Sequence, residues 1–253
     1  MCLNFVASTN ASWINDHFAL SLPKKFDSEI YPGYYCPIIR AAFDKGVYQC
    51  DLAHFGLIPP WAKSIKSTKY THNVRSESMT ANHLPRLGRE TYNARSETVS
   101  SKPSFRMAWN YKHFALVIVD GFFQPNYESG TPVRWFIKKS DSKPFALACL
   151  WDRWADVKEG KDIISFSILT KDASSHSLLK RFHKPGDPKR MPILISEKDM
   201  SSWLEANLKV ANELISNDSG LTLIGEPAVK DLKLGKATEL YTFNNQIKNK
   251  LTI

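Results

Sequence analysis

The chain has 253 residues, of which 43% are hydrophobic, 12% aromatic and 23% charged. This composition supports a globular core and excludes a disordered chain. No apolar run approaches the ~18 residues of a membrane helix, and no basic segment followed by an apolar stretch marks a secretory signal. We therefore expect one cytoplasmic domain over residues 1–253, with no membrane segment.

A formal net charge of +9 and a pI near 9.3 predict a polyanionic partner, with nucleic acid first. A generally basic surface is the alternative. Lysine and arginine are spread along the chain, which favours a patch assembled by folding over a basic tail.

The four cysteines are Cys2, Cys36, Cys50 and Cys149. They form no CxxC pair and no His/Cys cluster with zinc spacing, so we expect reduced thiols and neither a metal nor a cofactor. Cys36 and Cys149 stand in apolar or aromatic surroundings and are predicted core residues.

Cys2 becomes the first residue when the initiator methionine is removed. It then carries an α-amine that titrates near pH ~8 and a thiol near ~8.5 on adjacent carbons. Such a pair can trap an aldehyde, first as an imine and then as a thiazolidine. The same residue could instead attack an amide, with its own amine as base.

Two polar or aromatic segments follow. Residues 55–63 are punctuated by Gly56 and two prolines and contain Trp61, which is either a packing aromatic or a stacking platform for a nucleobase. Residues 93–98 read Asn-Ala-Arg-Ser-Glu-Thr. They are either a turn or helix cap, or a site in which Asn93 donates to a reacting oxygen and Arg95 binds phosphate.

Strands dominate the middle of the chain. Apolar and β-branched runs predict them at 114–119, 134–138, 144–150, 163–170 and 191–195, with a turn at 126–130. Gln124 follows the first run, in Asp-Gly-Phe-Phe-Gln-Pro, and is expected to point inward or into a pocket. Strands without long intervening helices predict an α+β fold, an antiparallel barrel-like sheet with flanking helices.

The C-terminal part combines a basic turn with helices. His183 lies in the turn at 182–192, where it is either an exposed loop residue or a neutral-pH acid and base. One helix is predicted near 174–181. Another starts after Ser196, with Met200, Trp203, Leu204 and Leu208 on one face. We assign 196–253 to this helix and a closing segment of the same domain.

Taken in order, these motifs resemble the SOS response-associated peptidase (SRAP) family, the abasic-site shield proteins. The resemblance rests on Cys2, on the segments at 56–63, 93–98, 102–106, 119–123 and 150–154, and on His183 before Arg-Met-Pro at 190–192. It covers residues 2–195 and implies a single SRAP domain.

The resemblance implies an enzyme that protects abasic sites in single-stranded DNA during the DNA damage response. Cys2 condenses with the ring-opened sugar to form a thiazolidine crosslink. Asn93 matches the residue that orients the sugar, and His183 the general acid and base that opens the ring. The family is also linked to lyase activity at abasic sites and, by its name, to thiol autoproteolysis.

The DNA contacts are implied in the same way. Trp61 matches an aromatic against the bases and Arg95 a phosphate contact, and Thr170 and Arg190 are expected to contact phosphate. We expect a monomer that is associated with the nucleoid when it is bound to damaged DNA.

Three features depart from the family pattern. Leu3 and Asn4 replace the usual Gly-Arg after the cysteine, which removes a phosphate contact. The segment between Trp61 and Asn93 is longer than usual. The family's catalytic glutamate falls on Gln124, which can hydrogen-bond but cannot exchange a proton at neutral pH. Two alternatives therefore stay open: a thiol peptidase that uses Cys2, and a non-catalytic binder of single-stranded DNA.

Overall fold

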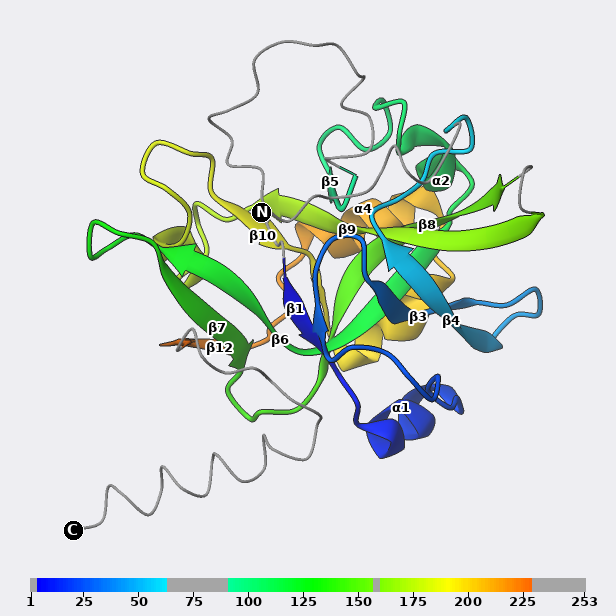
Figure 1. Ribbon diagram of the computed structural model, residues 1–253, viewed down its shortest axis with the longest axis horizontal. Coiled ribbons are helices and arrows are strands. Elements are labelled where there is room, and N and C mark those ends of the chain that lie inside the picture. Colours follow the sequence, from blue (N-terminus) through cyan, green and yellow to red (C-terminus); the bar gives the residue numbers. More distant parts are fainter. Residues whose placement is uncertain (1–3, 63–90, 157–159, 229–253) are drawn as a thin grey trace.

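The computed structural model describes residues 4–62, 91–156 and 160–228 (Figure 1). Twelve strands in these ranges share one hydrogen-bonded sheet. They are β1 (Phe5–Ala7), β2 (Glu29–Ile30), β3 (Tyr35–Ala41), β4 (Tyr48–Phe55), β5 (Asn93–Arg95), β6 (Phe114–Asn126), β7 (Val133–Lys139), β8 (Phe145–Asp156), β9 (Lys161–Asp172), β10 (Arg190–Pro192), β11 (Leu194–Ile195) and β12 (Leu223–Pro227). The helices are α1 (Ala11–Phe18), α2 (Arg106–Asn110), α3 (Met200–Leu204) and α4 (Leu208–Ser216), with 3-10 turns at Leu179–Arg181 and Glu197–Asp199.

Five of the strands close into a barrel. β8 pairs with β9, β9 with β4, β4 with β3, β3 with β6, and β6 again with β8. Every pair in this ring is antiparallel except β4–β9, and β5 also lies parallel to β9. The predicted barrel-like sheet with flanking helices is thus confirmed, with two parallel pairs that the sequence did not indicate.

The apolar run at 114–119 follows from the position of β6 in the barrel. Alternate side chains of a strand face opposite sides. Ala115 and Val117 pack with the cluster inside the barrel, which includes the buried Cys36 and Cys149 as predicted. Phe114 and Leu116 pack with the cluster beneath the helices. Because both faces are buried, the strand is continuously hydrophobic instead of alternating.

The helices cover the outside of this barrel (Figure 1). Trp203 of α3 is fully buried, its indole nitrogen donates to the Ala115 carbonyl at 3.0 Å, and its ring packs on Phe114 at 4.8 Å. In the described ranges, no helix has the length and apolar character needed to cross a membrane.

The β6 strand runs seven residues beyond the predicted end at Val119. Its first half pairs with β8, and its second half pairs with β7. At the transition, a Cβ atom on Gly121 would lie 2.4 Å from the Phe136 ring and 2.5 Å from the Ile137 carbonyl oxygen. Only glycine allows this close approach, so Gly121 lets β6 continue from the barrel to Gln124.

Three predicted elements differ from those observed. Residues 174–181 form only a short 3-10 turn, because the His176 ring accepts the amide protons of Leu178 and Leu179 that a helix would use. The helix after Ser196 is divided into a 3-10 turn and α3, and Leu208 begins α4, which Asn207 caps. The strand at 191–195 is divided because β10 pairs with β9 and β11 with β8.

Candidate functional site

The N-terminal strand is fixed beside the second half of β6. The Asn4 carbonyl accepts from the Phe123 amide at 2.9 Å. The Asn4 side chain donates to Glu29 at 2.7 Å and accepts from Arg134 at 2.8 Å, and Arg134 also pairs with Glu29. Arg134 in turn lies over the Phe123 ring. The chain is therefore held next to the residue that precedes Gln124. Cys2 itself lies outside the described residues.

Gln124 is a buried amide on β6, opposite Trp135 on β7. Its side chain is 1% exposed, and in the described part of the chain neither its oxygen nor its nitrogen has a hydrogen-bond partner. An unsatisfied buried polar group costs about 1–3 kcal/mol. Such a group is typical of a site where a bound molecule supplies the missing partner.

The segment 181–183 is fastened along the β6–β7 turn. Arg181 donates to both carboxylate oxygens of Glu128, at 2.8 and 2.7 Å. Phe182 forms a β-bridge with Asn126, and the His183 amide donates to the Pro125 carbonyl at 3.0 Å. The structure thus brings His183 to the residue that follows Gln124.

His183 has an unusual backbone and an unusual pKa. Its φ of 73° lies in the left-handed region, which costs a non-glycine residue roughly 1–2 kcal/mol. Burial lowers the pKa of its imidazole to about 4. The ring is therefore neutral at physiological pH, so it is free to take up a proton but binds it only weakly.

The predicted phosphate-binding residues gather along β9. Asn93, which begins β5, is buried, whereas Arg95 at its other end is exposed and lies opposite Thr170. Thr170 is buried, and its carbonyl and hydroxyl oxygens accept from Arg190 at 2.6 and 3.0 Å. The loop between His183 and Arg190 connects these residues to the group around Gln124, since Lys189 donates to the His183 carbonyl at 3.1 Å.

Arg190 already has an anionic partner within the protein. It donates to the two carboxylate oxygens of Glu97 at 2.6 and 3.0 Å. Burial acts to raise the pKa of Glu97, but the hydrogen bonds from Arg190 and from the Glu97 backbone, together with the charges of Arg190 and Arg95, outweigh it, and the pKa lies below its ordinary value. A phosphate at Arg190 stays a prediction, and it would compete with this carboxylate.

Trp61 lies on a loop anchored to the β8–β9 hairpin. The Ile58 amide donates to the Ser165 hydroxyl at 2.9 Å, and the Trp154 indole nitrogen donates to the Ala62 carbonyl at 2.8 Å. Leu57 is buried, whereas the Trp61 side chain is 46% exposed. This arrangement suits the predicted stacking platform, because the anchored loop holds an exposed indole ring in place.

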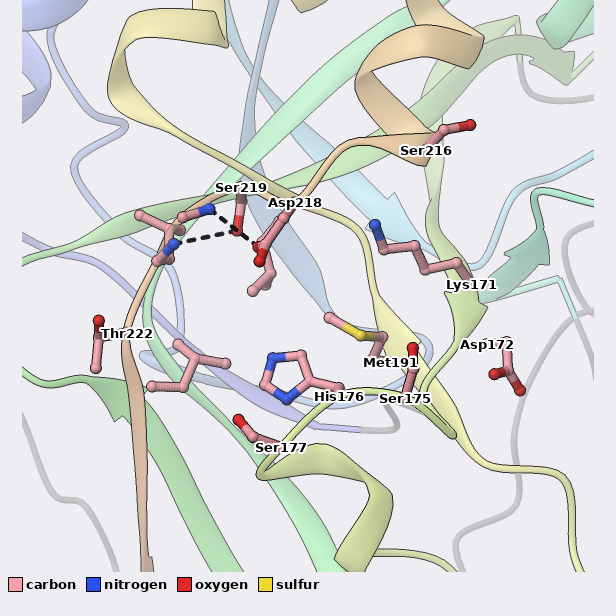
Figure 2. A pocket seen from close by; sticks show the side chains of 14 residues that line it. Lys171, Asp172, Ser175, His176, Ser177, Met191, Ser216, Asp218, Ser219 and Thr222 are labelled. Atoms are coloured by element: carbon pink, nitrogen blue, oxygen red, sulfur yellow. Dashed lines mark hydrogen bonds between the residues drawn. The ribbon is translucent and has the colours of Figure 1, made fainter.

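A pocket of about 580 Å³ lies elsewhere, between β9, β10 and residues 216–223 (Figure 2). None of the predicted site residues lines it. His176 lies inside it, but the imidazole Nδ1 accepts two backbone amide protons, so a carboxylate cannot orient this ring through Nδ1 as in a hydrolytic triad. Lys171 donates to the carbonyls of Ile215 and Asn217 at the end of α4.

Sequence reasoning missed several residues that hold the site together. Glu97 lies in the segment at 93–98 and Trp154 in the segment at 150–154, but neither has a predicted role of its own. Glu29 and Arg134 gave no signal, because their partners are distant in sequence. In the ranges that the structure covers, no three His, Cys, Asp or Glu side chains are grouped as metal ligands.

The fold and site define a class of small barrel proteins in which the N-terminal strand borders a buried amide and a strained histidine. A protein from Bordetella bronchiseptica has this fold, with a TM-score of 0.76, 23% identity and coverage of 90% of this chain and 100% of that one. A protein from Bacteroides thetaiotaomicron has a TM-score of 0.72, 21% identity and coverage of 93% and 95%.

The chain belongs to the SOS response associated peptidase (SRAP) family, which it matches over residues 1–84 and 80–224. It is 29% identical over 151 residues to the abasic site processing protein YoqW of Bacillus subtilis, covering 59% of this chain and 54% of that protein. It is 26% identical over 218 residues to the abasic site processing protein HMCES of Rattus norvegicus, covering 69% and 55%. The chain thus spans about half the length of these curated relatives.

Replacing Trp154 with phenylalanine tests the anchor of the Trp61 loop. The ring is kept but the hydrogen bond to Ala62 is lost, and such a bond contributes about 0.5–1.5 kcal/mol. We expect amide hydrogen exchange at Ala62 to become about 2- to 10-fold faster. Trp13→Phe, in α1, is the matched control and should leave this amide unchanged. Equal exchange in both variants would show that the indole nitrogen does not hold the loop.

Glu97→Gln tests the pair with Arg190. Because the pKa of Glu97 is lowered in the folded state, the pair stabilises the protein above the ordinary value of 4.5, and this contribution is lost as the pH falls below it. We expect the variant to be less stable at pH 7 by up to about 1 kcal/mol and to show a weaker loss of stability in acid. Urea unfolding from pH 7 to below pH 4.5 measures the stability at neutral pH and its loss in acid. Glu226→Gln, in an exposed pair with Lys138, is the control.

Proposed function

We propose that this protein processes abasic sites in single-stranded DNA by forming a covalent crosslink through Cys2. The observation that carries the proposal is the meeting of the N-terminal strand, an unpartnered buried amide and a neutral histidine at one end of the β6–β7 hairpin. Family membership and the names of the relatives support the substrate.

The proposed reaction needs Cys2 as the first residue. Its α-amine attacks the aldehyde carbon of the ring-opened sugar, and water leaves as the imine forms. The thiol then adds to the same carbon, and its proton passes to the nitrogen, which closes the thiazolidine. Two new bonds, carbon to nitrogen and carbon to sulfur, replace the carbonyl, and no oxidant or cofactor enters the balance.

Chain connectivity favours Cys2 for this role. Two residues of extended chain span at most about 7 Å, so Cys2 is tethered within that reach of Asn4, which lies beside Phe123. Burial raises the pKa of Cys36 well above its usual range and that of Cys50 to about 11, and Cys149 is fully buried. These thiols are poor nucleophiles at neutral pH.

His183 would transfer the proton during ring opening, and Gln124 would hold the reactants by hydrogen bonds. The neutral imidazole of His183 accepts the proton of the anomeric hydroxyl as the bond from the anomeric carbon to the ring oxygen breaks, and it returns this proton to the released ring oxygen. Gln124 holds the sugar or the attacking group by hydrogen bonds, since an amide offers both a donor and an acceptor. Asn93 orients the sugar from β5 in this proposal.

The DNA strand would lie along the basic side of this site. Arg95 is exposed and can bind a phosphate, with Thr170 and Arg190 behind it. Trp61 offers a ring for stacking. The net charge of +9 favours the polyanion at long range.

A denaturing gel tests the crosslink. Incubation with an abasic single-stranded oligonucleotide should give a shifted covalent band that Cys2→Ala removes. Cys50→Ala is the matched control and should keep the band. Absence of a band with retained DNA binding would replace this proposal with a non-catalytic binder, and cleavage of a peptide in trans would favour the thiol peptidase.

Gln124→Glu tests the position at which this chain has glutamine in place of the family's glutamate. General acid and base catalysis is typically worth about 10²–10⁴ in rate, so we expect crosslink formation and reversal to accelerate by about 10-fold or more. Burial should raise the pKa of the new carboxyl, which adds a pH dependence near neutrality. Gln124→Leu, which removes hydrogen bonding but keeps the volume, should slow the reaction. Unchanged rates in both variants would contradict a role for this position.

A further inference from the structure

A column of stacked side chains lies at the start of β6, away from the site described above. The rings of Tyr111 and His113 are stacked with centroids 5.9 Å apart, and those of His113 and Trp151 with centroids 4.5 Å apart. The Arg40 guanidinium lies 4.1 Å from the centre of the Trp151 ring. Tyr111 and His113, which lie between α2 and β6, thus form one continuous stack with Trp151 of β8 and Arg40 of β3.

The inner members of this column are fixed in place. Arg40 forms an ion pair with Asp51 at 2.6 Å. The Trp151 amide donates to the His113 carbonyl at 2.9 Å, which joins β8 to the residue before β6. Burial lowers the pKa of His113, so the ring is neutral at physiological pH. The outer ring, that of Tyr111, therefore stacks on a rigid aromatic support.

The outer end of the column is open and positively charged. Tyr111 is 65% exposed, and it follows the last residue of α2. Lys102, Arg106 and Lys112 are exposed on the same short stretch of chain. In the described part of the protein, none of these three forms an ion pair, so their charges are available to a partner.

The column lies on the same side of the molecule as the Trp61 loop. Trp151 and Trp154 are three residues apart on β8, about 10 Å along the strand, with their side chains on opposite faces of it, and Trp154 holds that loop through Ala62. Figure 1 shows α2 and the segment that ends at residue 62 on the same side of the molecule, over β8. Because Tyr111 directly follows α2, a DNA strand that passes the Trp61 loop on this side of the molecule can continue toward Tyr111.

We propose that Tyr111 is a second stacking platform, which binds an unpaired base of single-stranded DNA beyond the abasic site, with Lys102, Arg106 and Lys112 contacting the flanking phosphates. The proposal rests on the proposed function for the position of the strand. An exposed aromatic side chain combined with exposed cations is what single-stranded DNA binders use without sequence preference.

Undamaged single-stranded DNA tests this platform independently of any crosslink. We expect Tyr111→Ala to weaken binding of an oligonucleotide of about 16 nucleotides by about 5- to 100-fold, the loss of one base stack. Tyr111→Phe, which keeps the ring, should bind within about 2-fold of the wild type. Phe43→Ala removes a fully exposed aromatic outside the column and should have no effect.

A stacking readout separates this role from a change in folding. A 2-aminopurine base in the oligonucleotide should be quenched by the wild type and by Tyr111→Phe, and less by Tyr111→Ala. Crosslinking of an abasic oligonucleotide of about 4 nucleotides, too short to reach the platform, should be equal in all three proteins. Equal affinity and quenching in Tyr111→Ala would overturn the inference. Loss of the crosslink with a retained Tyr111 effect would overturn only the proposed function.

Discussion

The pairing of β6 with β8 is the interaction on which the rest of the structure depends. It closes the barrel from Phe114 to Val119, and the same strand then leaves the barrel and pairs with β7 and β1. One uninterrupted strand therefore joins the hydrophobic core to the site. The rigidity of the core reaches Gln124 without an intervening loop.

This continuity also explains which features were predictable. The run at 114–119 was clear because both faces are buried, whereas residues 120–126 mix polar, aromatic and proline residues and do not show a strand pattern. Their conformation depends on Gly121 and on pairing with β7, which are tertiary constraints. The helix predicted at 174–181 is absent for a different and local reason, since the His176 side chain competes with the helical hydrogen bonds.

The sequence predicts which residues to consider for the site, but it does not predict the contacts that they make. The ordered motifs named Gln124, His183 and Arg190. They did not indicate that Glu128 would fix Arg181, or that Glu97 would neutralise Arg190. These pairs join residues 53 and 93 positions apart, and local sequence holds no information about such partners. The site is therefore less basic than the chain's charge suggests.

The backbone of His183 has a consequence for how this protein balances stability against function. A φ of 73° is one that glycine adopts without strain, so a chain selected for stability alone would place glycine there. The loop keeps an imidazole instead, held by the Pro125 carbonyl and by Lys189. The conformational energy stored at this residue is thus the part of the fold's stability that is given up to present one side chain.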